Sequence, residues 1–350
     1  MKILYLYAEV MGYTMATIKE LVKHGNEVHV ICWVDKKKTS YQTAAMSGVT
    51  FYARESYTSN ELHSLTASIN PSITVVSGWM DQGYLSVAAG LRRQRKIVVC
   101  GLDSQWNRSV RQMLSSTLGS FHYFSRFYSH VWVAGTYQYE FARRLGFKKS
   151  QIIYDLYSAD LEQFNAGYQA SVNMKADCYP HRFLFVGRLE LVKGVDILVS
   201  AWKSLATHRQ DWDLMMIGSG SMRSSVNDAD AIYVKDFLQP EQLAEEISTA
   251  GCFVLPSRCE PWGVVVHEFA AAGMPVLASD VVGAACSFII NGYNGFLFRS
   301  ESVDALRESM VKIIARDDDV LRMMGQRSHE LASRITPATS AANLMSVTTV

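Results

Sequence analysis

The sequence predicts an α/β protein made of two doubly wound domains, each with a parallel sheet covered by helices. Short apolar runs alternate with segments of helical periodicity, which is the pattern of βαβ units. This alternation occurs once in residues 1–165 and again in residues 181–334. The chain has 350 residues, of which 49% are hydrophobic and 19% charged, so it contains enough apolar surface for two buried cores.

The N-terminal domain is expected over residues 1–165. Its first helix is predicted over Thr14–His24, because Gly25 follows as a stop signal. The predicted strands are short apolar runs at Ile3–Tyr7, Glu27–Ile31, Ile73–Val76, Lys96–Cys100 and His130–Ala134.

A linker is expected over residues 166–180, since this region lacks clear periodicity and contains turn-forming residues such as Asn173 and Pro180. The C-terminal domain follows over residues 181–334. Its strands are predicted at Phe183–Val186, Asp213–Ile217, Ala231–Val234, Cys252–Leu255 and Val276–Ala278. Helix-start signals at Asp317 and Pro337 predict two last helices.

Composition excludes several classes of protein. No stretch approaches the ~20 uninterrupted apolar residues of a membrane span, and the first residues form a strand pattern and not a signal peptide, so a cytoplasmic protein is expected. Six scattered cysteines without a Cys-x-x-Cys pair predict neither a disulfide framework nor a zinc site. Residues 1–165 carry 18 Lys/Arg and 12 Asp/Glu, a basic excess that suits a phosphate-bearing acceptor or an anionic membrane surface.

Two glutamates, Glu260 and Glu268, are the most informative residues. Ser257–Gly263 is expected to form a loop after a strand, and Val264–Ala272 a helix that ends at Gly273. At about 1.5 Å of rise per residue, both carboxylates can reach opposite ends of one extended ligand. The free N–H groups of the first helical turn favour an anionic or hydroxyl-rich ligand. The alternative is a solvated loop acid beside an ordinary acid of a helix surface.

The segment Cys259–Val276 resembles the Glu-x7-Glu signature of the retaining glycosyltransferases of family 4, also called group 1. The resemblance implies the GT-B fold, in which two facing Rossmann-like doubly wound domains enclose an inter-domain cleft. It also implies that residues 335–350 pack back on the N-terminal domain. Five further segments match in the family's order: Phe185–Gly194, Leu214–Gly220, Phe253–Ser257, Pro275–Ser279 and Asn291–Leu297.

Two cations, Arg188 and Lys193, follow the predicted strand Phe183–Val186. At the mouth of a parallel sheet they can neutralise a diphosphate, Arg188 by a forked contact and Lys193 as a point charge. Glycosyl transfer requires such neutralisation, because the nucleoside diphosphate leaves with new negative charge. The alternative is a loop with two solvated cations.

The resemblance implies further donor contacts. Glu260 is expected to bind hydroxyls of the donor sugar and Glu268 the ribose hydroxyls, while the backbone of Trp262, Gly263 and Val264 approaches the sugar and the distal phosphate.

The nucleotide end is expected to meet two further segments. Gly218 and Arg223 match the family's Gly-x-Gly-x-x-Arg loop, although Ser219 replaces the usual acid. The segment around Leu238 matches the stretch whose backbone reads the base. Asp236 stands there in place of an expected glycine, which leaves the base preference open.

The N-terminal half matches the family more loosely. Gly12 follows the first strand, either as a phosphate contact or as an ordinary turn glycine. Asp103 stands near the place of a family histidine and either contributes to catalysis or caps the next helix. Trp79 and Asp81 follow another strand end and suit sugar stacking with a hydroxyl contact on the acceptor side, unless Trp79 belongs to the core.

Arginines beside aromatic residues in Arg108–His130 suit either a membrane interface with a lipid-linked acceptor or core packing. Nucleic-acid binding is not suggested.

The predicted activity is transfer of a sugar, with retention, from a UDP-type or GDP-type sugar to a saccharide, lipid-linked or small-molecule acceptor. Glu260, Arg188, Lys193 and Asp103 are the expected catalytic residues. No cofactor is expected, and the resemblance implies that cations replace a metal; no Asp-x-Asp motif is present. The alternatives are a sugar-phosphate-using enzyme of the same architecture and a nucleotide-sugar sensor without turnover.

Overall fold

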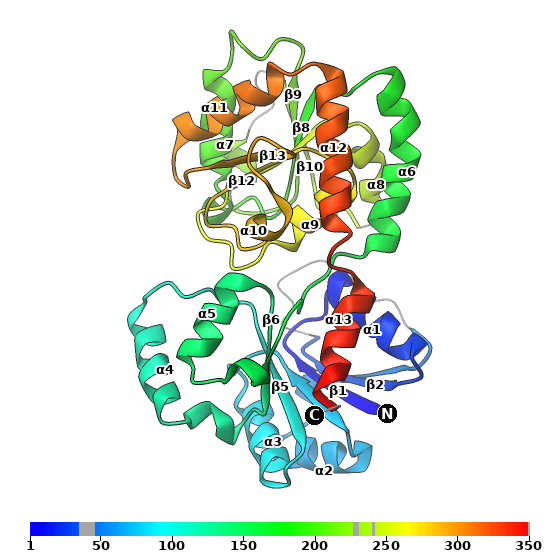
Figure 1. Ribbon diagram of the computed structural model, residues 1–350, viewed down its shortest axis with the longest axis vertical. Coiled ribbons are helices and arrows are strands. Elements are labelled where there is room, and N and C mark those ends of the chain that lie inside the picture. The colour runs from blue at the N-terminus through cyan, green and yellow to red at the C-terminus, as the bar shows by residue number, and fades with distance from the viewer. Residues whose placement is uncertain (35–45, 227–230, 240–241, 349–350) are drawn as a thin grey trace. The chain divides into compact units, whose positions relative to one another are not determined.

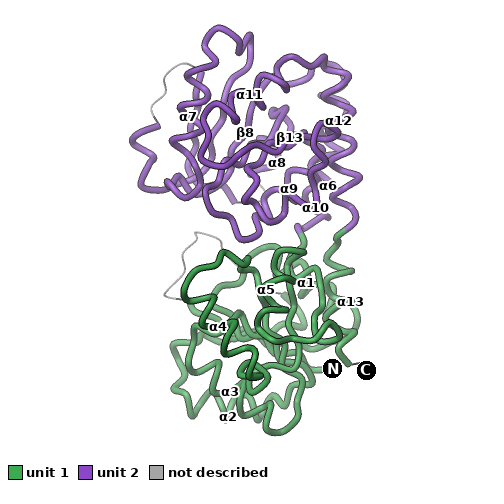
Figure 2. The backbone as a smooth tube through the Cα atoms, turned by 60° about the vertical axis from the view of Figure 1, so that its left-hand side comes forward, with its two compact units in different colours: residues 1–158, 335–350 green, residues 159–334 purple. Residues whose placement is uncertain are grey.

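The computed structural model describes residues 1–34, 46–226, 231–239 and 242–348. Contacts divide the chain into two compact units (Figure 2). Unit 1 comprises residues 1–158 and 335–350, and unit 2 comprises residues 159–334. Every strand pairing among the described residues is parallel, which confirms the predicted α/β class with two doubly wound sheets.

The described part of unit 1 contains a seven-stranded sheet in the order β3-β2-β1-β4-β5-β6-β7. Strands β1, β2, β5 and β6 are labelled in Figure 1. Strand β1, in the interior of this sheet, is buried on both faces, since Ile3, Leu4 and Leu6 are fully inaccessible to solvent. A continuous apolar run is what a strand covered by helices on both sides requires. The strands are β1 (Lys2–Tyr7), β2 (Glu27–Cys32), β3 (Val49–Ala53), β4 (Ile73–Val76), β5 (Ile97–Leu102), β6 (His130–Val133) and β7 (Ile152–Ile153).

Helices cover the sheet of unit 1, and the last described helix returns to it from the far end of the chain. This helix, α13, packs on α1, and Asn343 donates a 3.0 Å hydrogen bond to the Asp155 carboxylate. Residues 349–350 of the C-terminal segment lie outside the described residues. The α-helices are α1 (Gly12–Lys23), α2 (Ser59–Ile69), α3 (Gln82–Arg93), α4 (Val110–Ser120), α5 (Thr136–Arg144) and α13 (Pro337–Met345).

The described part of unit 2 contains a six-stranded sheet in the order β10-β9-β8-β11-β12-β13. Strands β8 and β11 are neighbours in this sheet although most of the unit's first half separates them in sequence. The order of strands therefore reverses between β8 and β11. The strands are β8 (Arg182–Val186), β9 (Asp213–Ile217), β10 (Ile232–Lys235), β11 (Cys252–Leu255), β12 (Val276–Ser279) and β13 (Gly295–Phe298).

Unit 2 begins with a long helix where a linker was expected. Residues 166–177 lie inside α6, which packs on α8 and α9, so the linker expected over residues 166–180 is corrected. The helix escaped prediction because its buried face is formed largely by small or polar residues, including Gly167, Ser171 and Lys175. The α-helices are α6 (Leu161–Asp177), α7 (Val195–Ser204), α8 (Leu243–Ser248), α9 (Val264–Ala271), α10 (Ala285–Phe288), α11 (Val303–Ile314) and α12 (Asp318–Ala332).

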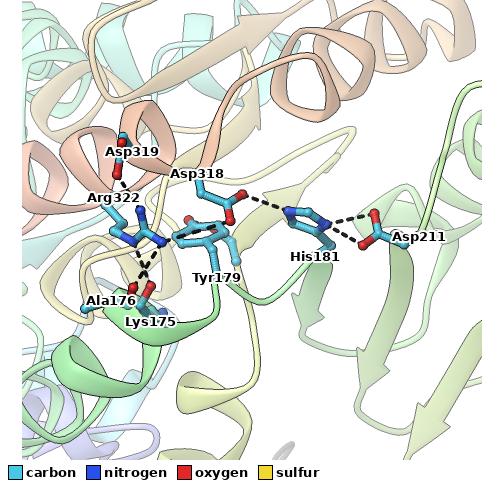
Figure 3. Close-up of polar contacts among 9 residues, drawn as sticks. Lys175, Ala176, Tyr179, His181, Asp211, Asp318, Asp319 and Arg322 are labelled. Atoms are coloured by element: carbon cyan, nitrogen blue, oxygen red, sulfur yellow. Dashed lines mark hydrogen bonds and ion pairs between the residues drawn. The ribbon is translucent and has the colours of Figure 1, made fainter.

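A polar network fastens the N-terminal edge of this sheet to α12 (Figure 3). His181, just before β8, contacts Asp211 at 2.7 Å through Nδ1 and Asp318 at 2.9 Å through Nε2. Arg322 donates a 2.7 Å hydrogen bond to the carbonyl of Lys175 at the end of α6. The network thus joins β8, α6 and α12 on the side of the sheet away from its carboxyl edge.

Short 3₁₀ segments complete the described structure: η1 (Arg54–Ser56), η2 (Tyr123–Arg126), η3 (Lys149–Gln151), η4 (Leu191–Lys193), η5 (Arg223–Ser225) and η7 (Ser346–Thr348). Within the described residues, no helix has the length and apolar character needed to cross a bilayer.

Candidate functional site

The carboxyl ends of β8 and β11 define the candidate donor site of unit 2. Open α/β sheets bind ligands where the strand order reverses, in the crevice outside the carboxyl ends of the strands. In unit 2 this point lies between β8 and β11. The loop of residues 187–194 follows β8, and the loop of residues 256–263 follows β11, so the two loops that carry the predicted residues leave neighbouring strands.

Two of the predicted residues are in direct contact. The ammonium of Lys193 forms an ion pair with Oε2 of Glu260, and both side chains are largely buried, at 18% and 11% exposure. The Ser257 hydroxyl also donates to this oxygen, at 3.4 Å. A cation and a carboxylate therefore share one position at the reversal of strand order.

Glycine allows the two loops to approach each other. Gly194, which links η4 to α7, has φ of 70°, and a Cβ built there would lie 2.0 Å from the carbonyl oxygen of Pro256. No side chain fits this contact, and the left-handed conformation itself favours glycine. Lys193 is thereby held beside the loop that carries Glu260.

Arg258 locks the same two loops together. Its guanidinium forms two 2.6 Å hydrogen bonds with the Asp196 carboxylate and a third, also 2.6 Å, with the carbonyl of Leu191. The Arg258 backbone N–H donates to Val192 at 2.9 Å. The hydrogen bonds from Arg258 lower the pKa of Asp196. This pair was not found from the sequence; the available signal was an acid two residues after Gly194 and a base two residues before Glu260.

The turn after Glu260 is fixed by backbone contacts. Gly263 has φ of 90°, and a Cβ there would lie 2.9 Å from Cγ of Glu260. The carbonyl of Trp262 accepts a 2.8 Å hydrogen bond from Ala284, while its indole is buried at 3% exposure. Helix α9 then begins at Val264 without a side-chain cap, so its first N–H groups stay free of capping side chains.

Glu268 lies in the second turn of α9 and is partly buried. Burial, followed by the nearby Asp160 carboxylate, raises its pKa to about 7. The neighbouring His267 fixes the helix, because its ring accepts the N–H of Ala159 at 3.0 Å and donates to the carbonyl of Ala332 at 2.9 Å. Burial lowers the pKa of His267 to about 4. The Glu268 carboxyl is thus held in a rigid, weakly solvated place.

The glycine loop after β9 packs on the loop that carries Arg188. Gly218 has φ of 148°, and a Cβ there would lie 1.9 Å from the carbonyl of Gly187. The N–H of Leu189 donates to Ser219 at 2.9 Å. The predicted glycine loop therefore supports the residues on both sides of Arg188, whose own side chain is exposed.

The two residues expected at the nucleotide end are less enclosed. Arg223 lies 3.7 Å from Asp236, and both side chains are well exposed. Leu238 is half-buried in the extended segment after β10. The geometry places Arg223 and Asp236 next to each other.

Unit 1 has a pocket of about 350 Å³ at the carboxyl ends of β1, β4 and β5. Trp79 and Asp103 both line it, as does Tyr157. The Trp79 ring packs on Phe124 with centroids 5.3 Å apart. Asp103 is exposed and does not cap α4, whose N-cap is Ser109. Burial, assisted by Asp103, raises the pKa of Tyr157 well above its usual value.

Asp81 does not line this pocket. Its carboxylate caps α3 by accepting the N–H of Tyr84 at 3.1 Å, pairs with Arg54 at 3.0 Å and accepts the Trp33 indole N–H at 3.2 Å. The acceptor-side position expected for Asp81 is corrected, because these three donors occupy its oxygens. Gly12 is the first residue of α1, directly after the loop that leaves β1, and does not line the pocket either.

No group of three or more His, Cys, Asp or Glu side chains within the described residues is arranged to hold a metal ion.

Comparison with known proteins finds that the C-terminal half is similar to one family. The profile of the family "Glycosyl transferases group 1" matches residues 177–330. An uncharacterized glycosyltransferase of Methanocaldococcus jannaschii is 28% identical over 157 residues, which cover 43% of this chain and 43% of the relative. In three curated relatives the aligned region spans less than half of the relative's length, from 41 to 48%.

Solved structures match nearly the whole chain at low identity. Sucrose-phosphate synthase from Thermosynechococcus elongatus has a TM-score of 0.73 and 20% identity, and the match covers 99% of this chain and 97% of that structure. Anabaena HepE, solved in complex with UDP and glucose, has a TM-score of 0.73 and 15% identity, with 100% and 99% covered. These matches show the fold, GT-B. The part of the chain that is similar to the glycosyl transferases of group 1 is residues 177–330.

Proposed function

We propose that this chain is a retaining glycosyltransferase that takes a sugar from a nucleoside-diphosphate donor. The observation that carries the proposal is the Lys193–Glu260 pair at the reversal of strand order, held by the Arg258–Asp196 ion pair. The family of residues 177–330 supports it, as does the fold shared with HepE, which was solved with UDP-glucose. A UDP-sugar is therefore the first donor to test.

In the proposed reaction the bond between the anomeric carbon and the diphosphate oxygen breaks, and a bond from the acceptor oxygen forms on the same face. The acceptor proton passes to the departing phosphate oxygen. Negative charge grows on that phosphate, so Lys193 and the exposed Arg188 stabilise the transition state more than the ground state. Positive side chains fill the role that a divalent metal has in other transferases.

The two glutamates have different proposed roles. Glu260 orients hydroxyls of the transferred sugar, since it lies beside Lys193 at the reacting end. Glu268 binds the ribose hydroxyls from the second turn of α9. The backbone of Trp262, Gly263 and Val264 approaches the sugar and the distal phosphate, because the glycine turn and the uncapped helix start leave N–H groups for it.

The remaining assignments follow the same division. Gly218, Arg223 and Leu238 contribute to the nucleotide end of the donor site. Gly12 stays the proposed phosphate contact of unit 1. Trp79 and Asp103 line the pocket of about 350 Å³ in unit 1, which has room for a sugar ring and an aromatic wall on which the ring can stack. The proposed acceptor is a saccharide, a lipid-linked saccharide or a small hydroxyl compound.

Thermal stabilisation by UDP, GDP and ADP, followed by release of free nucleotide from the matching sugar donors, tests the proposal. Glu260→Gln is expected to lower turnover about 100-fold while nucleotide stabilisation persists. Lys203→Ala, which removes an exposed lysine of α7, is the matched control for Lys193→Ala and should leave turnover unchanged. Stabilisation by nucleotide without any release from a panel of donors and acceptors would identify a sensor and overturn the proposal.

A further inference from the structure

Helix α4 turns its apolar residues toward solvent. Val110 is 73% exposed, Leu114 62% and Phe121, directly after the helix, 79%. Residues spaced three and four apart lie on one face of a helix, so these side chains form a continuous apolar stripe. We call this stripe, with one neighbour from the loop after β4, the α4 face; its members are Met80, Val110, Met113, Leu114, Leu118 and Phe121.

The opposite side of α4 holds the helix to unit 1 with small and polar residues. Gly119 is the buried residue of α4, and a Cβ there would lie 2.5 Å from the backbone of Leu145. Ser116 donates a 3.1 Å hydrogen bond to the carbonyl of Arg144, and Gln112 donates at 2.6 Å to the carbonyl of Gln105. The usual arrangement of a surface helix is therefore inverted, because the apolar stripe faces outward. An exposed apolar patch of this kind marks an interaction site.

Charge identifies the partner. Residues 104–139 contain no Asp or Glu, whereas Arg108, Arg111 and Arg126 are all exposed. Arg111 borders the α4 face, since its guanidinium lies 3.1 Å from the sulfur of Met80. Exposed apolar side chains bordered by cations complement an anionic lipid surface. A second copy of the chain would bring the same arginines against each other across a twofold axis, which is repulsive.

We propose that the α4 face docks on anionic membranes. The apolar side chains enter the boundary between head groups and acyl chains, and the arginines bind lipid phosphates. Residues Arg111, Gln112 and Ser115 of α4 also line the unit 1 pocket, so docking brings the mouth of that pocket to the lipid surface. The docking does not depend on the proposed transferase reaction. Docking would bring a lipid-linked acceptor to the pocket, and that consequence rests on the proposed function.

Co-sedimentation of the full chain with phosphatidylcholine vesicles, with and without phosphatidylglycerol, tests the docking. The wild type is expected to sediment with the anionic vesicles only, less so as salt rises. Leu114→Glu combined with Phe121→Glu should abolish sedimentation, and each of Arg108→Gln and Arg126→Gln should weaken it about five-fold. Met174→Glu, which changes an apolar residue of α6 that is 55% exposed, should have no effect.

Three results would overturn the docking proposal: no sedimentation with anionic vesicles, equal sedimentation with neutral ones, or a wild-type dimer that the α4 variants dissociate. Stabilisation by UDP is measured on the same variants. Its retention in a variant that has lost vesicle binding separates the docking surface from the donor site, so the two proposals can fail independently.

Discussion

Nη1 of Arg258 lies 2.6 Å from Oδ1 of Asp196, and Nη2 lies 2.6 Å from Oδ2, so a forked ion pair joins the loop after β11 to the first turn of α7. Neither residue belongs to the Lys193–Glu260 pair. Both stand a few residues from it, and the fork fixes the distance between the two loops. The Arg258–Asp196 pair therefore sets where Lys193 and Glu260 stand relative to each other.

Removing this fork is predicted to lower kcat. Asp196→Asn leaves one charged partner without its pair and loosens both loops, so kcat should fall about ten-fold or more with a smaller change in KM. The kcat of Arg258→Lys should fall by a similar factor, because lysine cannot form the forked contact. Steady-state kinetics with the identified donor measure the effect.

The matched control is a second forked pair in unit 2. Arg182 bonds Asp213 at 2.6 and 2.7 Å between β8 and β9. Asp213→Asn removes a fork of the same chemistry, so it should lower the melting temperature without a selective loss of kcat. If both variants lose kcat in proportion to their melting temperatures, the Arg258–Asp196 pair acts on stability alone.

Glu268→Gln is predicted to stabilise the unliganded protein and weaken nucleotide binding. The Glu268 pKa, about 7, lies above its ordinary value near 4.5, so the folded state binds more protons between these pH values and stability falls as pH rises through them. The glutamine variant does not lose this stability, so its free energy of unfolding at pH 8 should exceed that of the wild type by roughly 1–3 kcal/mol. Thermal melts at pH 5 and 8, with and without UDP, measure both effects.

Glu245→Gln, at an exposed position of α8, is the control and should change neither quantity. An unchanged UDP shift in Glu268→Gln would speak against contact between this residue and the nucleotide.

Lys175→Met is predicted to stabilise unit 2. The Lys175 amine is buried and, within the described residues, has no hydrogen-bond partner. Burial lowers its pKa to about 8, so the folded state binds fewer protons between about pH 8 and 10.5 and the amine costs stability at neutral pH. The variant should gain up to roughly 3 kcal/mol at pH 7, and the gain should shrink toward pH 10.5. Denaturant unfolding at both pH values measures it; Lys203→Met, at an exposed site, should show no gain.

His181→Gln is predicted to destabilise the protein more in acid than in base. Burial opposes protonation of His181, but the hydrogen bonds to Asp318 and Asp211 outweigh it and raise the pKa above 6.5. A raised pKa adds stability that is fully present below the unfolded value of about 6.5 and is lost as pH rises through the folded value. Melting temperatures at pH 5.5 and 8.5 should show the larger deficit at pH 5.5.

The control for this variant is His208→Gln. His208 is exposed and contacts the neutral hydroxyl of Thr207 at 2.9 Å. A pH-independent deficit in His181→Gln, equal to that of the control, would mean that the two aspartates add no charge stabilisation.

The strands were the most predictable part of the fold. The predicted strands Ile73–Val76, Asp213–Ile217 and Cys252–Leu255 have the same bounds as β4, β9 and β11, because strands buried on both faces read as unbroken apolar runs. Strands β3, β7 and β13 were missed: β3 is only partly buried, β7 has two residues, and all three lie at the edges of their sheets. Local pattern carries little information for such edges.

The site was predictable only where a motif is local. Glu260 and Lys193 could be named, but their contact joins residues far apart in sequence. The Arg258–Asp196 pair spans 62 positions, and no periodicity links such residues. The position of Asp81 was predicted wrongly although the relevant signal is local. An Asp directly before a helix is an ordinary N-cap, and the Asp81 carboxylate caps α3.

The course of the chain also has a consequence for engineering. Residues 159–334 enter and leave unit 1 at one place, since the Ser158 hydroxyl lies 3.4 Å from the carbonyl oxygen of Ile335. Unit 2 is thus an insertion between two segments of unit 1. Recombination between relatives can exchange the whole of unit 2 through two adjacent junctions, while α13 keeps its packing on unit 1.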